Sequence, residues 1–516
     1  MVTSRSGRIA GGLSVGYLNT AVITLVGLWL TPFLLRHLDQ HNYGLWLLTA
    51  QTLFYLGLTD LGIVALLPRE VAFVAGRPKA TLALEVRSLV GETARLVFWQ
   101  LPLAAIVGVV TWWLVWRTWP ALSGPFAVVV ATFVLTFPLR IFQAVLQGLQ
   151  DLTWLGGVQI ASWIGGTIVT IVLVAAGVEI YALAAGWATT QVLSAGLAWL
   201  RLRRRFPDVL PVRLPGLALS SARAHLSRGV WISVSQVAQV LLNGTDLLVI
   251  GAMLGPNAVV PYACTGKLIA FLANQPALFM QTSLPALSEL RASAPRERMC
   301  QVSTSLTQLL LITSGAFACM ALAFNGSFVT WWVGPSRFGG DTLSALMVLA
   351  MLLRHWNVSA VYTLFCFGNE RRLAITTAVD GLVGLLAMAL LVPRLGVHGA
   401  ILGSILGVVA ISLPGNLRAL AREQGVPFLA SIRPLRPWFG RFTPIALVVI
   451  ATFMWSPVPP LIVGALAAVA IGIIYTAFII PVALQPPLGL LLAPKLRAWL
   501  GYLPTWSKRV VGELTS

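Results

Sequence analysis

The sequence predicts an all-α, polytopic membrane protein, and three observations carry that prediction. Of the 516 residues, 58% are hydrophobic and only 10% are charged, whereas a soluble domain carries about 25% charged residues. The mean hydropathy is +0.86. Apolar runs of at least 18 residues recur along the chain, each long enough to cross a hydrocarbon core of about 30 Å. These features exclude a soluble enzyme, a secreted disulfide scaffold and a β-barrel, whose strands would alternate with period two.

Charged, proline-rich and glycine-rich breaks divide the chain into about fourteen predicted transmembrane helices. Their predicted limits are 12–35, 43–67, 92–116, 123–149, 154–176, 180–200, 229–253, 258–285, 303–328, 341–367, 374–392, 397–420, 442–457 and 460–482. The first apolar stretch follows Arg5 and Arg8 and is too long for the core of a signal peptide. It also lacks an A-x-A cleavage site, so we interpret it as an uncleaved first helix.

The positions of Lys and Arg predict the orientation. The chain has 35 Lys and Arg against 16 Asp and Glu, a formal charge of +19. Three of the 35 lie within predicted spans, four lie on one set of alternate loops, and the remaining 28 lie at the termini and on the opposite loops. The positive-inside rule therefore places both termini in the cytoplasm. The same rule accounts for the charge excess without a nucleic-acid partner.

The chain also repeats itself at a shift of about 219 residues. The tripeptide TWW at position 111 recurs at 330, and the dipeptide GV at 177 recurs at 396. Six helices per unit is an even number, so the repeats run parallel, as in alternating-access transporters. The predicted domains are an N-terminal six-helix lobe (1–205), a basic cytoplasmic linker (206–228), a C-terminal six-helix lobe (229–421), helices 13 and 14 (422–485) and a cytoplasmic tail (486–516).

Polar residues follow one face of several predicted spans. A charge at mid-bilayer costs about 2.5–3.5 kcal/mol on insertion scales, so each charge needs a partner or a wet cavity. The stripes are Arg140, Gln143, Gln147 and Gln150 in the fourth span, Gln236, Gln239, Asn243 and Asp246 in the seventh, Lys267, Asn274 and Gln281 in the eighth, and Arg354, His355 and Asn357 in the tenth. Hydrogen bonds between helices explain the Gln and Asn stripes equally well. An ion pair between Asp246 and Lys267 fits the sequence, and the sequence favours neither a structural nor a functional role for it.

Arg140 and Arg354 lie in corresponding helices of the two lobes, and no acidic residue within those spans neutralises them. Two unpaired arginines facing a cavity suit a pyrophosphate, which guanidinium groups bind bidentately. The candidate substrate-binding residues are Arg140, Arg354, Lys267, Gln143, Gln147, Gln239 and Asn243. The candidates for a coupling proton or cation are Asp60, Asp246 and Asp380. Asp60 precedes Leu61-Gly62 and suits a helix cap or kink equally well.

Several chemical motifs are absent from the sequence. It has no GxxxxGK[ST] loop, no HExxH, no metal-spaced histidines and no nucleophile–base pair. The four cysteines show no ligand spacing and are interpreted as small core residues. We therefore expect a protein that is not an enzyme and holds no cofactor or metal. Transport would be driven by an ion gradient, by the substrate gradient or by consumption of the product outside.

A family resemblance appears around the second span, which reads RHLDQHNYGLW at 36–46, LTDLG at 58–62 and PRE at 68–70. This pattern resembles the bacterial polysaccharide biosynthesis, or O-antigen, flippases of the multidrug/oligosaccharidyl-lipid/polysaccharide exporter superfamily. The segments GLQ at 148–150 and GNER at 368–371 are also similar to that family.

The resemblance implies a flippase for undecaprenyl-diphosphate-linked oligosaccharide in the bacterial inner membrane, serving the biosynthesis of lipopolysaccharide or other surface polysaccharide. It implies membrane lipids, a glycan polymerase, and protons or sodium ions as candidate partners. The alternative is a cation-coupled multidrug or small-molecule antiporter on the same fold. A cationic drug prefers an acidic, aromatic cavity, and the three basic span residues favour an anionic substrate. A membrane glycosyltransferase would be expected to have a sizeable outer loop or soluble domain, and a non-transporting scaffold would not need unpaired arginines.

Overall fold

The structure is a computed structural model that describes residues 5–75, 82–211, 233–242, 244–454 and 456–490. Within these ranges the chain is helical or in turns, with no strand. Two compact units form, Met1–Val240 and Leu241–Ser516. We call them unit 1 and unit 2. The predicted all-α membrane fold is confirmed by these helices and their apolar composition.

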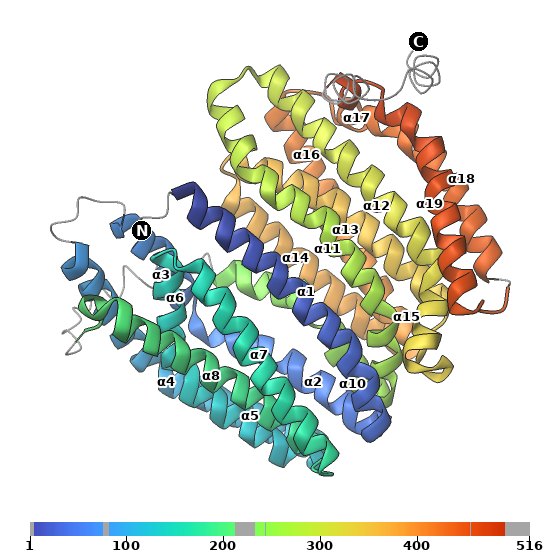
Figure 1. Ribbon diagram of the computed structural model, residues 1–516. Helices are drawn as coiled ribbons and strands as arrows, with labels where there is room; N and C mark the ends of the chain where they lie inside the picture. Colours follow the sequence, from blue (N-terminus) through green and yellow to red (C-terminus); the bar gives the residue numbers. More distant parts are fainter. Residues whose placement is uncertain (1–4, 76–81, 212–232, 243, 455, 491–516) are drawn as a thin grey trace. The chain divides into compact units, whose positions relative to one another are not determined.

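Unit 1 is built from helices that run side by side (Figure 1). They are α1 (Arg5–His37), α2 (Gln40–Gly57), α3 (Ile63–Ala75), α4 (Leu82–Thr118), α5 (Ser123–Thr136), α6 (Arg140–Gly148), α7 (Leu152–Ala175) and α8 (Ile180–Arg205), with 3₁₀ turns η1 (Leu58–Asp60), η2 (Pro120–Leu122), η3 (Phe137–Leu139) and η4 (Pro207–Val209). The main packing pairs are α7 with α8, α5 with α8, α3 with α6 and α1 with α7. Its core includes Leu45, Val71, Phe126 and Val145.

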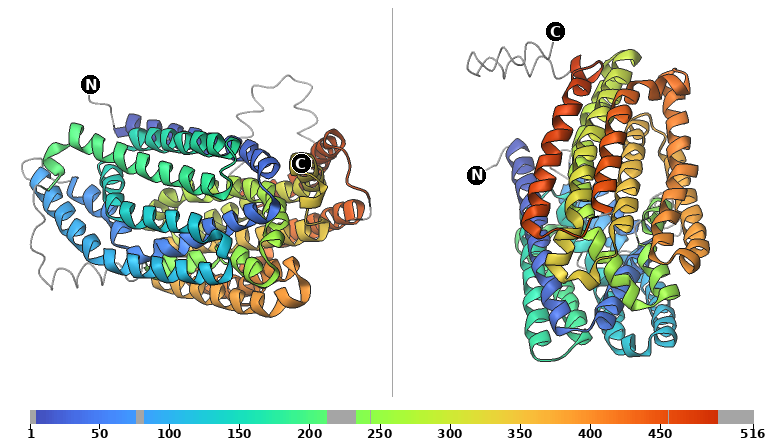
Figure 2. Two further views of the ribbon diagram at one scale, coloured as in Figure 1. Left: turned by 90° about the horizontal axis from the view of Figure 1, so that it is seen from below. Right: turned by 90° about the vertical axis from the view of Figure 1, so that its right-hand side faces the viewer.

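Unit 2 combines two helices of 38 residues with several short ones and one π turn. The elements are α10 (Asp246–Leu254), α11 (Pro256–Ser293), α12 (Arg296–Val333), η5 (Pro335–Arg337), α13 (Asp341–Cys366), α14 (Glu370–Leu395), α15 (Val397–Gly407), the π turn η6 (Val408–Ser412), α16 (Leu413–Gln424), α17 (Phe428–Ile432), η7 (Arg433–Leu435), α18 (Arg436–Met454) and α19 (Leu461–Ala483). The red helices α18 and α19 both pack against α12 (Figure 2). Trp438 on α18 donates to Tyr475 on α19, which donates to the Ile312 carbonyl oxygen on α12.

The predicted spans can be compared with these helices. Each of the fourteen predicted ranges overlaps a described helix, but residues 61–62 interrupt the second range and residues 244–245 interrupt the seventh. Eight described helices are long and apolar enough to cross a membrane, and ten if each of two bent pairs counts as one crossing. The number of fourteen crossings therefore stays a prediction. Most of the predicted linker and tail, residues 212–228 and 491–516, lies outside the described residues.

The second predicted span is broken in the middle. The segment Gln40–Asp60 meets Ile63–Val74 at 58°. Leu61 and Gly62 occupy the break with φ angles of 48° and 72°. This left-handed backbone suits glycine but strains leucine, whose Cβ approaches the following carbonyl oxygen. A kink is one of the alternatives that the sequence left open here, and the break lies directly before the first turn of α3.

Helices α7 and α8 approach each other closely at two glycines, Gly166 and Gly186. A Cβ atom added to Gly166 would lie 2.5 Å from the Gly186 carbonyl oxygen, and one added to Gly186 would lie 2.7 Å from the Gly166 carbonyl oxygen. The two glycines therefore let the backbones approach each other, as small residues commonly do between membrane helices. This contact fixes the face of α8 that is turned towards α7.

Candidate functional site

A cavity of about 510 Å³ lies within unit 1, among α2, α5, α6 and α8. Its lining combines one cation, two amides, a hydroxyl and several aromatic rings. The lining residues are Trp46, Ala50, Leu53, Phe54, Gly57, Phe133, Thr136, Arg140, Gln143, Trp187, Gln191 and Ala195. The cavity therefore offers a positive charge beside flat apolar surfaces.

Arg140 is placed at the cavity by a local break in the fourth predicted span. Pro138 lies in the 3₁₀ turn Phe137–Leu139 between α5 and α6. Because proline has no backbone N–H, it cannot extend the hydrogen-bond ladder of α5. Arg140 is then the first residue of α6. Within the described chain Arg140 makes no hydrogen bond or ion pair, and it interacts electrostatically with Asp60. Its guanidinium donors remain available to a ligand.

The glutamines of the same stripe divide between two roles. Gln143 lines the cavity and donates to the Ser194 hydroxyl on α8 at 2.6 Å. It therefore makes the hydrogen bond between helices that the sequence left open as an alternative. Gln147 is exposed and is not among the lining residues. Gln150 lies beyond the end of α6, in a turn with φ of 59°. The predicted four-residue stripe thus contributes two residues to the cavity.

The cavity also contains lining residues that are not part of the predicted polar stripes. Trp46, on α2, lines the cavity. Trp187 and Gln191, on α8, were missed. Their spacing of four, followed by Ser194, is the same helical pattern that identified the stripe of the fourth span. That pattern could have found them.

Asp60 lies at the end of the broken helix and is only 2% exposed. Its Oδ1 accepts a hydrogen bond from the Val64 backbone N–H at 3.1 Å. Its carbonyl oxygen accepts one from Gln100 Nε2 at 3.1 Å. The carboxylate therefore binds an amide of the first turn of α3, where the helix dipole favours negative charge. The capping role is observed, and the coupling role stays a prediction.

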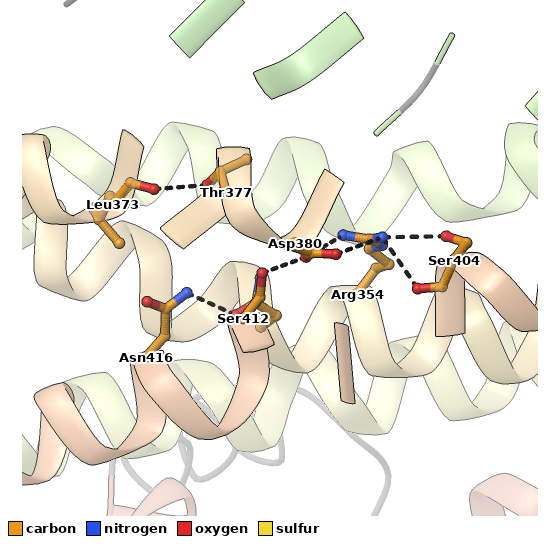
Figure 3. A network of polar contacts seen from close by, with 8 residues as sticks. Arg354, Leu373, Thr377, Asp380, Ser404, Ser412 and Asn416 are labelled. Carbon is orange, nitrogen blue, oxygen red and sulfur yellow. Dashed lines mark hydrogen bonds and ion pairs between the residues drawn. The ribbon is translucent and has the colours of Figure 1, made fainter. Parts of the chain in front are cut away.

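In unit 2, Arg354 lies at the centre of a polar network on four consecutive elements (Figure 3). Its Nη1 donates to Asp380 Oδ2 at 2.8 Å. Its Nη2 donates to the hydroxyl of Ser404 at 3.1 Å and to the Ser404 carbonyl oxygen at 3.3 Å. Ser412, in the π turn, donates to the same carboxylate oxygen of Asp380. The arginine and the aspartate thus form a compensated pair.

This pairing corrects the expectation that Arg354 is unpaired. That expectation followed from the absence of a carboxylate near Arg354 in its own predicted span. Its partner comes instead from α14, 26 residues further along the chain. The carboxylate is 1% exposed and the arginine side chain 24%. A buried carboxylate of this kind requires a cation or a proton, and Arg354 supplies the cation. Asp380 and Arg354 therefore form one ion pair, and a change in the charge of either residue affects the other.

The other polar residues of the tenth predicted span make hydrogen bonds between helices. His355 Nδ1 lies 2.7 Å from the Ser314 hydroxyl of α12. The Asn357 side-chain oxygen accepts from Asn416 Nδ2 on α16 at 2.9 Å. Both residues are buried. For them the structural alternative holds.

The candidate residues of the seventh and eighth predicted spans do not form one site in the described structure. Asp246, the first residue of α10, accepts from the Tyr262 hydroxyl at 2.9 Å. In the described chain Tyr262, rather than Lys267, is its side-chain partner. Lys267 lies exposed on α11, and Gln239 is also exposed. Asn243 lies outside the described residues. Neither Lys267 nor Gln239 lines the cavity of unit 1.

Comparison with known proteins adds an independent observation. The sequence profile described as "Polysaccharide biosynthesis protein" matches residues 97–324. The resemblance to polysaccharide biosynthesis proteins is confirmed over these residues, which are less than half of the chain. The chain is also 24% identical over 204 residues to EpsK, an uncharacterized membrane protein of Bacillus subtilis strain 168. That match covers 38% of this chain and 39% of EpsK, so the chain matches well under half of this relative's length.

Solved structures share the fold of this chain. The inward closed conformation of the lipid II flippase MurJ matches with a TM-score of 0.64 at 9% identity, over 90% of this chain and 98% of MurJ. An inward-facing multidrug resistance MATE family transporter of the MOP superfamily matches with a TM-score of 0.51 at 12% identity, over 81% and 99%. At such low sequence identity, these structural matches show a common fold and nothing more.

Proposed function

We propose that the chain is a flippase that moves undecaprenyl-diphosphate-linked oligosaccharide across the bacterial inner membrane by alternating access. The cargo would serve the synthesis of O-antigen or exopolysaccharide. The family match and the fold shared with MurJ support a transporter of lipid-linked glycans. Both termini would face the cytoplasm, and a glycan polymerase would act on the product outside.

The observation that carries the proposal is the Arg140 cavity. Among the described residues the Arg140 guanidinium has no partner at hydrogen-bond distance, a costly feature in a membrane protein unless a ligand or water meets it. A diphosphate supplies oxygen acceptors in the planar geometry that arginine binds. Trp46 and Trp187 add apolar ring faces on which sugar rings can lie. Gln143 and Gln191 add amides for hydroxyl groups.

The remaining candidates take secondary places in the proposal. Lys267, Gln147 and Gln239 would contact substrate in conformations of the transport cycle other than the present one, and Asn243 stays a candidate for substrate binding. Arg354 would bind diphosphate only after Asp380 releases it, so protonation of Asp380 is a candidate coupling step. Asp60 and Asp246 stay candidates for the same role.

The alternative function is a cation-coupled antiporter, which is supported by the fold that the chain shares with a MATE transporter. The cavity composition argues for the flippase. Its described lining contains an arginine and no Asp or Glu. A cationic drug would meet repulsion from Arg140, whereas a diphosphate would be attracted.

The test is complementation of a deletion strain of the source bacterium. The deletion is expected to abolish one surface polysaccharide and to accumulate its undecaprenyl-linked repeat unit in a form inaccessible from outside. Wild-type protein should restore the polysaccharide. Arg140→Ala should reduce restoration at least tenfold, because a charge-assisted contact to a diphosphate contributes about 1.5–3 kcal/mol. Trp187→Ala should reduce it by a smaller factor.

The matched control is Arg117→Ala. Arg117 stacks on Trp113 at 4.2 Å and does not line the cavity. It should complement like the wild type at equal membrane abundance. Full complementation by Arg140→Ala would refute the diphosphate role of that residue. Unchanged surface polysaccharide in the deletion strain, with altered sensitivity to cationic compounds, would favour the antiporter.

A further inference from the structure

A second groove in unit 1 lies between α7 and α8, at the end of α8 that carries four arginines. It has a volume of about 490 Å³ and shares no lining residue with the Arg140 cavity. Its lining residues are Asp151, Thr153, Trp154, Gly157, Val158, Ala161, Leu197 and Arg201. One end of the groove is charged and the rest is apolar, which is the pattern of an amphipathic ligand.

The charged end is built around Arg201. Its Nε donates to Asp151 Oδ2 at 2.8 Å. Its guanidinium carbon lies 4.5 Å from the centre of the Trp154 ring. The side chain is 30% exposed. The ion pair and the stacking hold the guanidinium plane in one orientation, and its two terminal amino groups have no hydrogen-bond partner in the described chain. They are therefore positioned donors for an anion.

The apolar part follows α7 away from Arg201. Gly157 and Ala161 are exposed, and a Cβ atom added to Gly157 would meet nothing within 4 Å. From Trp154 to Ala161 the helix rises about 10 Å, which is enough for the upper half of an acyl chain. Leu197 of α8 forms the opposite wall. The small residues of α7 thus keep an apolar channel open beside the charged end.

The surroundings favour a membrane lipid as the occupant. The last turn of α8 also carries Arg203, Arg204 and Arg205, all exposed. Arg203 lies 5.2 Å from the centre of the Trp199 ring, a second arginine–tryptophan stack on the same helix. Tryptophan and arginine gather at the membrane–water boundary. Basic pockets between membrane helices on the cytoplasmic side bind anionic headgroups.

We propose that this groove binds one anionic phospholipid, with its phosphate on the terminal amino groups of Arg201 and an acyl chain along Gly157 and Ala161. The lipid covers the α7–α8 pair at the headgroup level. Its binding is separate from the Arg140 cavity and does not depend on the proposed cargo.

The experiment measures lipids retained by the purified full-length protein in native mass spectrometry. The probes are phosphatidylglycerol, cardiolipin and phosphatidylcholine at equal concentrations. The wild type is expected to retain the two anionic lipids in preference to phosphatidylcholine. Gly157→Phe fills the groove and should abolish the retention of one lipid. The matched control is Gly196→Phe on α8, where the added side chain also meets open space outside the groove, and it should retain lipid like the wild type.

A second variant tests the headgroup contact without leaving a lone charge. Arg201→Gln combined with Asp151→Asn removes both members of the ion pair. It should lower the preference for anionic over zwitterionic lipid about fivefold, the effect of one arginine near an anionic surface. Equal retention by Gly157→Phe and wild type, or no anionic preference in the wild type, would overturn the proposal. The proposal would also fail if undecaprenyl diphosphate occupied the groove and neither phosphatidylglycerol nor cardiolipin was retained. The groove would then be a substrate site.

Discussion

At the scale of residues, the Arg354–Asp380 pair shows how differently two charges of one ion pair are placed. Asp380 is almost fully buried, whereas a quarter of the Arg354 side chain is exposed. A buried charge that loses its partner is more costly than an exposed one. The pair should therefore respond asymmetrically to substitution.

Arg354→Gln is expected to lower the free energy of unfolding by about 3–5 kcal/mol, because it leaves the Asp380 carboxylate uncompensated. Asp380→Asn should cost less, since water can reach the arginine. The double variant should be more stable than Arg354→Gln alone. Thermal unfolding in detergent can be followed with a thiol-reactive dye, because Cys264, Cys319 and Cys366 are buried. A double variant no more stable than Arg354→Gln would contradict this interpretation.

At the scale of elements, two local backbone features decide where unit 1 places its side chains. The glycine contact of α7 and α8 sets the facing surfaces of these helices. The break after Asp60 sets the direction of α3. Each feature gives a prediction that substitutions in unit 1 can test.

Gly166→Ala is expected to destabilise unit 1 by about 1–3 kcal/mol, the usual range for an overpacked contact. The added methyl group would lie 2.5 Å from the Gly186 carbonyl oxygen, and backbone can yield only by moving the helices apart. Gly196→Ala on α8 is the control, because its methyl group meets nothing within 4 Å. Equal melting temperatures of the two variants would show that α7 and α8 are not in this close contact.

The break after Asp60 predicts opposite effects at adjacent positions. Gly62→Ala should destabilise the protein and Leu61→Gly should stabilise it, each by about 1–2 kcal/mol, the cost of the left-handed conformation for a residue with a Cβ atom. Leu61 is 37% exposed, so its loss removes little packing. The same melting assay measures both variants. A destabilising Leu61→Gly would indicate that the leucine side chain contributes more than its backbone strain.

At the scale of the whole molecule, the membrane crossings remain to be counted. The predicted topology has fourteen crossings, and ten described segments meet the criterion of length and composition. Reporter fusions that are active on only one side of the membrane can decide. Fusions after Gln424 and after Gln485 should report the cytoplasm, and a fusion at Val458, between α18 and α19, should report the outside. A cytoplasmic signal at Val458 would remove two crossings from the predicted topology.

The helices of the whole molecule could be predicted from sequence because a lipid environment leaves few alternatives. Every backbone group must be bonded internally, so long apolar runs become helices. The site was less predictable. The partner of Arg354 lies on the next helix, and pattern within one span cannot find it. Trp187 and Gln191 have a helical spacing from which they could be predicted. The left-handed Leu61 had no signal, since leucine seldom adopts that conformation.

The π turn Val408–Ser412 has a consequence for the angular phase of the chain. A π turn accommodates one residue more than the α-helix that flanks it. Each residue rotates an α-helix by about 100°, so this surplus residue sets the angle at which everything after it emerges. Ser412 reaches the carboxylate of Asp380, and Asn416 reaches Asn357 four residues later. Removing one residue at the exposed Val409 would restore a regular helix and turn both side chains away from their partners together. One surplus residue thus sets the rotation about the helix axis on which both contacts depend.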